Sequence, residues 1–444
     1  MKYFKLTIPL LFLLTSCEKF LEVQPELQVD ESIAIINTST AETAVTGLYS
    51  RLASDGYYGS NYPSLAYLPG GDVKWSGSAS GLAQFNSHDI TADNSTVRSA
   101  WVAIYRTILS ANQIIEKVPL VGDSLFAKSK RDQLIGEAHF IRALSYFDLV
   151  RAWGGVQLVL TPTKTAADQK GISRSSEGET YAQVLKDLVT AEGLLPEGTN
   201  RFRATKKTAY ALRSRYHLYR QEWDSAEVYA SRLIKDGAYR LAKPYGSFFL
   251  NNAKGTEESV FELTYSASFT NNHSNQWLPP AKSGRREWAP SDELVALLND
   301  PLKGGNRNVL IDKTPTGLYF GNLYYRSPKG TDPSYVIRIA ELYLIRAEAR
   351  AQQGKLAEAL QDLNAIRDRA GITPLYTTDQ EAILRAIEQE RRLEFPFESD
   401  RWFDLVRTGR AAAVLGITDT NKFLFPIPSD EIAADGALTQ NPGY

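Results

Sequence analysis

Hydrophobic side chains recur at helical spacing through much of this chain. From 97 to 115 they fall on one stripe after Asn94, a residue type that caps helix N-termini. The stretch 129–153 carries apolar residues on more than one face, which predicts a helix inside the assembly. Two further helices are predicted over 181–195 and 206–221. The scaffold is therefore expected to be helical.

Two stretches, 209–230 and 340–363, repeat one plan along the chain. In each, an aromatic-rich helix turns through a short link into a helix whose alanines permit close approach. Such pairs resemble tetratricopeptide repeats, in which small residues let two helices nest. Gly237 and Gly371 follow the second helix of each pair, where a left-handed C-terminal cap is expected.

Two long segments, 54–92 and 242–334, lack helical periodicity. A structureless loop as long as the second is rare in a compact domain, so short strands, such as 259–265, and small local helices are expected there. Loops held by a rigid scaffold often carry binding sites. The predicted fold is mainly α: a tetratricopeptide-like helical-pair scaffold with a large irregular, loop-rich insertion that carries short strands. The predicted organisation is a single domain over 17–444, with helical repeats at about 94–241 and 335–410 and loop-rich ligand-binding regions at about 54–92 and 242–334.

The first residues have the features of an export signal. Residues 1–16 combine two lysines with an apolar run, 6–14, that is too short to span a bilayer. The segment ends at Cys17, the single cysteine, in a run that resembles the bacterial lipobox. We therefore predict a signal peptide over 1–16 and lipidation of Cys17, with the chain anchored to a membrane through acyl chains. The alternative is a leftover cysteine beside an ordinary signal cleavage site.

Charge and reactive residues exclude several classes of function. Lysine and arginine total 50 against 51 acidic residues, without a long basic run, so nucleic acid is not an expected partner. The four histidines are dispersed and lack the spacing of metal ligands, so neither a metal site nor a cofactor is predicted.

Paired carboxylates are the first candidates for catalysis. A glycosidase needs two of them about 5 to 10 Å apart across a sugar. Neighbouring arginines lower carboxylate pKa values, which favours an ion-pair network at helix ends over an acid catalyst. No catalytic residue is therefore predicted. The carboxylates that cluster near arginines are Glu390, Glu394, Asp400 and Asp404.

The aromatic residues of the irregular segments are better candidates for binding. The chain has 23 tyrosines and 7 tryptophans, and sugars rest their flat C–H faces on such rings while amides and charged groups orient the hydroxyls. Peptides can use the same surfaces, and the rings could instead form a core that holds the loops to the scaffold. Packing roles are expected for Trp101, Trp153, Trp223 and Trp402. The candidate ligand contacts are Trp75, Tyr57, Tyr58, Trp277, Trp288, Tyr324, Tyr325, Asn275, Gln276 and Arg285.

An ordered series of motifs resembles the SusD/RagB-like outer-membrane lipoproteins along the chain from Cys17 to Tyr444. Any one motif is weak, but this many in order are specific to the family. They are the opening Cys17–Pro25, Gly136–Leu144 leading to Tyr146–Arg151 and Trp153–Val156, Ile337–Ala349, Leu363–Gly371, Glu390–Arg392 with Glu394–Phe395, Arg401–Leu405, and the terminal Gln440–Tyr444.

The resemblance implies a nutrient-binding protein that is not an enzyme. It implies lipid anchoring to the outer membrane, facing the exterior, binding of an oligosaccharide or a peptide with a glycan favoured, and delivery to a SusC-like TonB-dependent β-barrel transporter. The helical pairs would pack against that barrel, and the ligand site would lie in the irregular half. The alternatives are a peptide-binding RagB-like lipoprotein, a surface glycoside hydrolase or peptidase, and a tetratricopeptide lipoprotein that only assembles envelope complexes.

Overall fold

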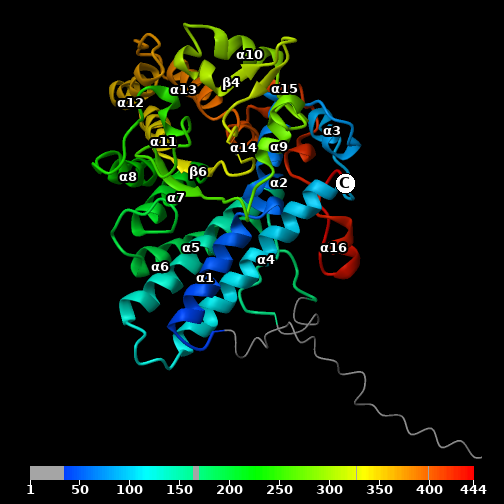
Figure 1. The fold of residues 1–444 in the computed structure, drawn as a ribbon, viewed down its shortest axis with the longest axis vertical. Coiled ribbons are helices and arrows are strands. Elements are labelled where there is room, and N and C mark those ends of the chain that lie inside the picture. The colour runs from blue at the N-terminus through cyan, green and yellow to red at the C-terminus, as the bar shows by residue number, and fades with distance from the viewer. Residues whose placement is uncertain (1–34, 164–169, 327, 399) are drawn as a thin grey trace, which may run out of the picture.

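The computed structural model describes residues 35–163, 170–326, 328–398 and 400–444, and helices dominate it (Figure 1). The predicted signal peptide, 1–16, and Cys17 lie outside the described residues. Within the described ranges, the strands form three separate two-stranded antiparallel sheets. The prediction of a mainly α fold with short strands is therefore confirmed.

The helices follow one another along the chain with a few short strands between them. The α-helices are α1 (Thr38–Leu52), α2 (Asn61–Tyr67), α3 (Ser80–Ser87), α4 (Ser95–Lys117), α5 (Lys128–Trp153), α6 (Glu177–Leu194), α7 (Lys206–Tyr219), α8 (Trp223–Ile234), α9 (His273–Trp277), α10 (Asp292–Asn299), α11 (Ile339–Gln352), α12 (Leu356–Arg369), α13 (Gln380–Glu394), α14 (Arg401–Arg407), α15 (Ala411–Leu415) and α16 (Ser429–Ala434). The strands are β1 (Val73–Trp75), β2 (Ser259–Leu263), β3 (Trp288–Pro290), β4 (Ile311–Lys313), β5 (Tyr319–Gly321) and β6 (Ser334–Arg338). A π-helical turn, η2, covers Asp55–Gly59.

Helices pack in consecutive pairs, α5 with α6, α7 with α8 and α11 with α12, and α8 also lies against α11 (Figure 1). Ala226 of α8 and Ala349 of α11 are fully buried in one cluster, because their small side chains let the helix axes approach. At the rim of this contact Arg350 donates a 2.8 Å hydrogen bond to Glu227. The predicted tetratricopeptide-like pairs are thus present as stacked helices.

Helix α5 is the centre of the scaffold. Every residue from Phe140 to Trp153 is buried, as its apolar residues on more than one face predicted. Its neighbours include α4 on one side and α6 on the other. Polar groups of α5 are therefore also buried, and each needs a partner inside the protein.

The helix ends agree with the sequence at some positions and differ at others. The Asn94 side chain accepts N–H bonds from Thr96 and Val97 at 3.0 and 3.1 Å, so the predicted cap is confirmed. Gly371 has the expected positive φ of 72° after α12. The same prediction for Gly237 is wrong, because α8 ends on Lys235 in a right-handed conformation and Gly237 has no positive φ.

The segment 54–92 is more helical than its sequence indicated, since it contains η2, α2 and α3. Most of α2 is buried on all sides, from Tyr62 to Tyr67, so its residues show no polar face and no amphipathic period. The segment 242–334 has the expected short strands and small helices. Its strand β2 pairs with β6. The pairing of β1 with β3 joins this segment to the segment 54–92.

Candidate ligand-binding site

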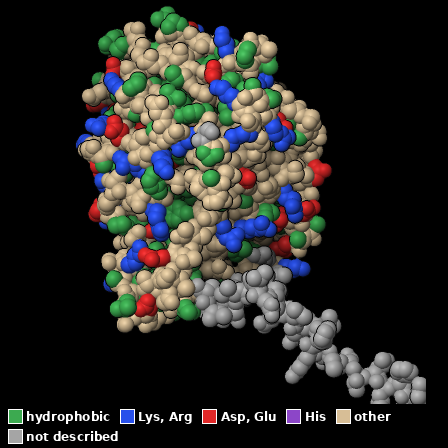
Figure 2. All heavy atoms as spheres, in the orientation of Figure 1, with side chains coloured by type: hydrophobic (Ala, Val, Ile, Leu, Met, Phe, Trp, Pro, Cys, Tyr) green, Lys and Arg blue, Asp and Glu red, His purple; other side chains and the backbone are tan. Residues whose placement is uncertain are grey.

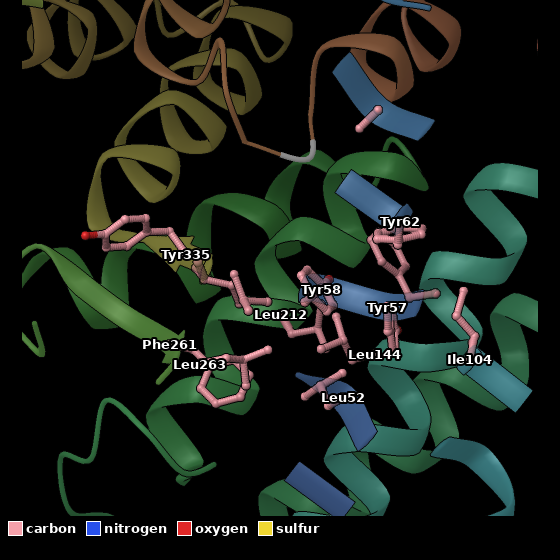
Figure 3. Close-up of a cluster of buried hydrophobic side chains, with 14 of the residues drawn as sticks. Leu52, Tyr57, Tyr58, Tyr62, Ile104, Leu144, Leu212, Phe261, Leu263 and Tyr335 are labelled. Carbon is pink, nitrogen blue, oxygen red and sulfur yellow. The ribbon is translucent and has the colours of Figure 1, made fainter. Parts of the chain in front are cut away.

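Two of the predicted ligand contacts, Tyr57 and Tyr58, lie in the core. Both hydroxyls donate to one oxygen of Asp148 on α5, at 2.7 and 2.8 Å, and Tyr62 donates to the other oxygen at 2.9 Å. Arg151 completes the site with a 2.5 Å bond to Asp148. Figure 3 shows the three tyrosines among buried leucine and isoleucine side chains.

This buried network fixes η2 and α2 to α5. Burial raises the pKa of both Tyr57 and Tyr58, so their hydroxyls stay protonated and remain donors. The rings also pack on each other, with centroids 4.8 Å apart. Neither ring has a face free for a sugar, and the packing role replaces the predicted ligand contact.

Trp277, Trp288 and Tyr324 are also packing residues. The two indoles meet edge to face with centroids 5.6 Å apart, and Tyr67 contacts both. Tyr324 stacks on His273 at 4.1 Å. These three side chains are at most 3% exposed, so they hold the irregular half together and present no surface to a ligand.

Trp75, Asn275 and Arg285 lie on segments of the irregular half that backbone hydrogen bonds join to one another. The β1–β3 pairing continues past Trp75, because the N–H of Ser76 donates to the carbonyl of Glu287 at 2.8 Å. Two residues before Glu287, the N–H of Arg285 donates to the carbonyl of Asn275 at 2.7 Å. The indole is half-buried and the Arg285 side chain is 59% exposed. The Arg285 guanidinium forms an ion pair with Glu287, and the side-chain amide of Asn275 donates a 3.0 Å bond to Asn272. We call the region around Trp75, Asn275 and Arg285 the Trp75 surface.

Neighbouring groups hold Trp75 in place. Its backbone N–H donates to the Asn86 side chain at 2.5 Å, and the amide of Asn86 in turn donates to the carbonyls of Leu68 and Val73 at 2.9 and 3.0 Å. Gly77 lies directly against the indole, where an added Cβ would come within 2.3 Å of the ring. The ring is thus supported from one side by backbone that only glycine permits.

The remaining two candidates do not join this surface. Gln276 is 8% exposed, and its side-chain oxygen is buried without a hydrogen-bond partner. The hydroxyl of Tyr325 donates to the carbonyl of Phe249 at 3.3 Å and accepts from the N–H of Asn252 at 3.1 Å. Gln276 is therefore buried away from a ligand, and the hydroxyl of Tyr325 links loop backbone groups. Sequence reasoning missed Asn86 and Gly77, whose only signal was their place in a Ser/Gly/Asn-rich segment beside a tryptophan.

The carboxylates considered for catalysis lie inside the protein beside arginines. Arg307 donates to Glu390 at 2.6 Å and to Glu394 at 3.0 Å. Burial alone would raise the pKa of Glu394, but Arg369 and Arg338 outweigh it and lower that pKa to about 2. Arg391 likewise donates to Asp404 at 2.5 Å. Glu390 and Glu394 are thus enclosed in an ion-pair network. Asp404 lines a cavity of about 210 Å³, but Arg391 and Arg407 outweigh its burial and lower its pKa to about 2, which does not suit an acid catalyst. Asp400 borders only a cavity of about 10 Å³.

Glu398 is the carboxyl group closest in character to an acid catalyst. Burial raises its pKa to about 7, although Arg338 donates to both of its oxygens, the nearer at 2.7 Å. It faces an enclosed cavity of about 10 Å³, which is the size of one water molecule and far smaller than a sugar. Among the described residues, no group of three or more His, Cys, Asp or Glu side chains could hold a metal ion. The same part of the chain has no helix with the length and apolar character needed to cross a membrane.

Known proteins of one family match nearly the whole chain. A family model described as "Starch-binding associating with outer membrane" matches residues 19–218, and the model of the SusD family matches residues 302–420. The SusD-like protein P2 of Formosa agariphila is 26% identical over an alignment that covers 100% of both chains. The starch-binding protein SusD of Bacteroides thetaiotaomicron is 34% identical over 24% of this chain and 21% of its own.

A solved structure shares the fold. A laminarin-binding SusD-like protein superposes with a TM-score of 0.81 over 92% of this chain and 100% of its own, at 24% sequence identity. Its helical architecture and the two family matches agree with the stacked helix pairs described above. The chain is therefore a SusD/RagB-like protein.

Proposed function

We propose that the protein binds a glycan at the cell surface, leaves it intact and delivers it to a SusC-like TonB-dependent transporter. The family description, starch binding in association with the outer membrane, supports the glycan and the location. The relatives named for starch and laminarin binding support the same ligand class. A peptide ligand has no comparable support.

The Trp75 surface is the observation that carries this proposal. Asn86 holds the backbone of Trp75 and Gly77 backs the indole, so the ring can stack on a sugar without first being ordered. Asn275 and Arg285 lie on the neighbouring segments, and their amide and the exposed guanidinium, which pairs with Glu287, can orient hydroxyl groups. Binding without cleavage is supported by the ion pairs that hold the candidate carboxylates Glu390, Glu394 and Asp404.

Delivery requires an anchor and a docking face. We propose lipidation of Cys17 as the anchor, from the lipobox-like sequence that precedes it. The stacked helix pairs are the proposed docking face, and they carry apolar side chains that are about half exposed, Val189 on α6 and Val228 on α8. Membrane fractionation of a Cys17→Ser variant would test the anchor, and co-purification of the protein with a SusC-like transporter would test the docking face.

Replacing Trp75 by alanine tests the binding site directly. The Trp75→Ala protein should bind laminarin or starch oligosaccharides more weakly by about 1 to 3 kcal/mol, because the stacking face is lost. Its melting temperature should stay close to that of the wild type, since the indole is only half-buried. Isothermal titration calorimetry and thermal unfolding give the two readouts.

Tyr376→Ala is the matched control, because Tyr376 is an aromatic residue that is 83% exposed beyond the second helix of a pair. It should leave glycan affinity unchanged. Equal losses in both variants, or a Trp75→Ala protein that loses stability and binding together, would show that Trp75 is a packing residue and would refute the proposed site.

A further inference from the structure

A groove lined by arginines is a second feature of the protein surface. This groove, of about 430 Å³, runs between α1, η2 and the first half of α4. Gly56 lies so close to α4 that an added Cβ would be 2.8 Å from the Cβ of Ala103, so glycine lets η2 line the groove. The polar residues that line it are Arg51, Arg98, Arg106, Ser54, Ser95 and Ser99.

The groove is positively charged and its lining contains no carboxylate. Within the described chain, the guanidinium groups of Arg51 and Arg106 make no ion pair, and both residues are exposed. Arg98 pairs at 2.8 Å with Asp430, whose side chain is 66% exposed and can be displaced from the pair at little cost. Figure 2 shows Lys and Arg side chains gathered over α4.

The nearest acidic residue in the sequence, Asp55, does not line the groove, although it lies between Ser54 and Gly56, which do. The hydroxyl oxygen of Ser99 accepts a 2.9 Å bond from Asn61, which leaves the hydroxyl hydrogen of Ser99 available to a ligand in the groove. The groove therefore offers cations and a hydroxyl donor, and Asp430, the partner of Arg98, is the carboxylate that an anionic ligand would displace.

Two series of hydrogen bonds connect the groove to the Trp75 surface. On one side, η2 bonds through the carbonyl of Gly59 to Asn272, and Asn272 accepts a 3.0 Å bond from the side chain of Asn275. On the other side, Asn94 at the start of α4 donates to the carbonyl of Gly81 in α3 at 2.7 Å. The same helix, α3, carries Asn86, which holds Trp75.

We propose that this groove is a second subsite, which binds anionic substituents of the glycan held at the Trp75 surface. Sulfate esters and carboxylates are the matching groups, since arginine pairs with their oxygens through several N–H donors at once. The protein would then select acidic polysaccharides over neutral ones with the same backbone. This inference rests on the proposed function, which supplies the glycan.

Binding of paired polymers tests the subsite. The probes are laminarin and chemically sulfated laminarin, and methyl-esterified pectin and polygalacturonate, titrated at low and at raised NaCl. The wild type should prefer the charged member of each pair, and NaCl should weaken that preference. In an Arg51→Gln/Arg106→Gln protein, the ratio of the affinities for the charged and the neutral polymer should fall about fivefold, because two exposed charge contacts are removed.

A control with equal loss of charge is Arg240→Gln/Arg385→Gln, since these side chains are 71% and 57% exposed on other parts of the molecule. It should keep the preference. The inference fails if the wild type shows no preference, if the Arg51/Arg106 variant keeps it, or if both double variants lose it equally. The Trp75→Ala variant separates the two proposals. It should weaken binding of the charged and of the neutral polymer by the same factor. Unchanged binding of the neutral polymer would refute the proposed function while leaving the anion groove in place.

Discussion

His273 is a titratable group buried at the junction between the two irregular segments. Its Nε2 atom lies 2.9 Å from the carbonyl of Tyr58, and its ring stacks on Tyr324 at 4.1 Å. Its other ring nitrogen is buried without a hydrogen-bond partner, which suits a neutral imidazole that donates from Nε2. Burial lowers the pKa of His273 to about 4 from an ordinary value of 6.5.

This lowered pKa makes stability depend on pH. As pH falls below 6.5, the unfolded chain binds a proton at this histidine before the folded protein does, so the contribution is lost progressively down to about pH 4. The loss amounts to about 3 kcal/mol. A His273→Gln variant lacks this titration, so the difference in unfolding free energy between wild type and variant should shrink from pH 7 to pH 4.5. Urea unfolding at several pH values measures it, and a difference that stays constant would contradict the buried neutral histidine.

Among the elements of the fold, the short strand β1 sets the position of Trp75 in the proposed site. β1 is only three residues long and is held by its pairing with β3 and by Asn86 of α3. Such a short strand has little stability of its own, so the position of Trp75 depends on these neighbours. The proposed site is thus built from an element too short to be recognised from hydrophobic periodicity.

Gly77→Ala should displace the indole, because the new Cβ would lie 2.3 Å from the ring. Glycan affinity should fall by about 1 kcal/mol, comparable to an aromatic contact, while the melting temperature changes little. Gly122→Ala is the control, since an added Cβ there meets no atom within 4 Å. Titration calorimetry that gave the two variants the same affinity would indicate that the ring position is unimportant for binding.

Across the whole molecule, the helical scaffold could be predicted from sequence and the binding surface only in part. The alanines of α8 and α11 and the cap at Asn94 act locally, so their patterns predicted the helix pairs. The network of Tyr57 and Tyr58 with Asp148 joins residues about ninety positions apart, and no local pattern reveals it. For the same reason, the sequence could not separate the buried Trp277 from the half-buried Trp75.

The proposed function requires the protein to hold a glycan without changing it. Its most direct test is to titrate the purified protein with laminarin and starch oligosaccharides in a calorimeter and then determine the mass of the recovered sugar. We expect saturable binding that depends on Trp75, with every oligosaccharide recovered at its original length. Shortened products, or the absence of binding to any glycan, would refute the proposed function.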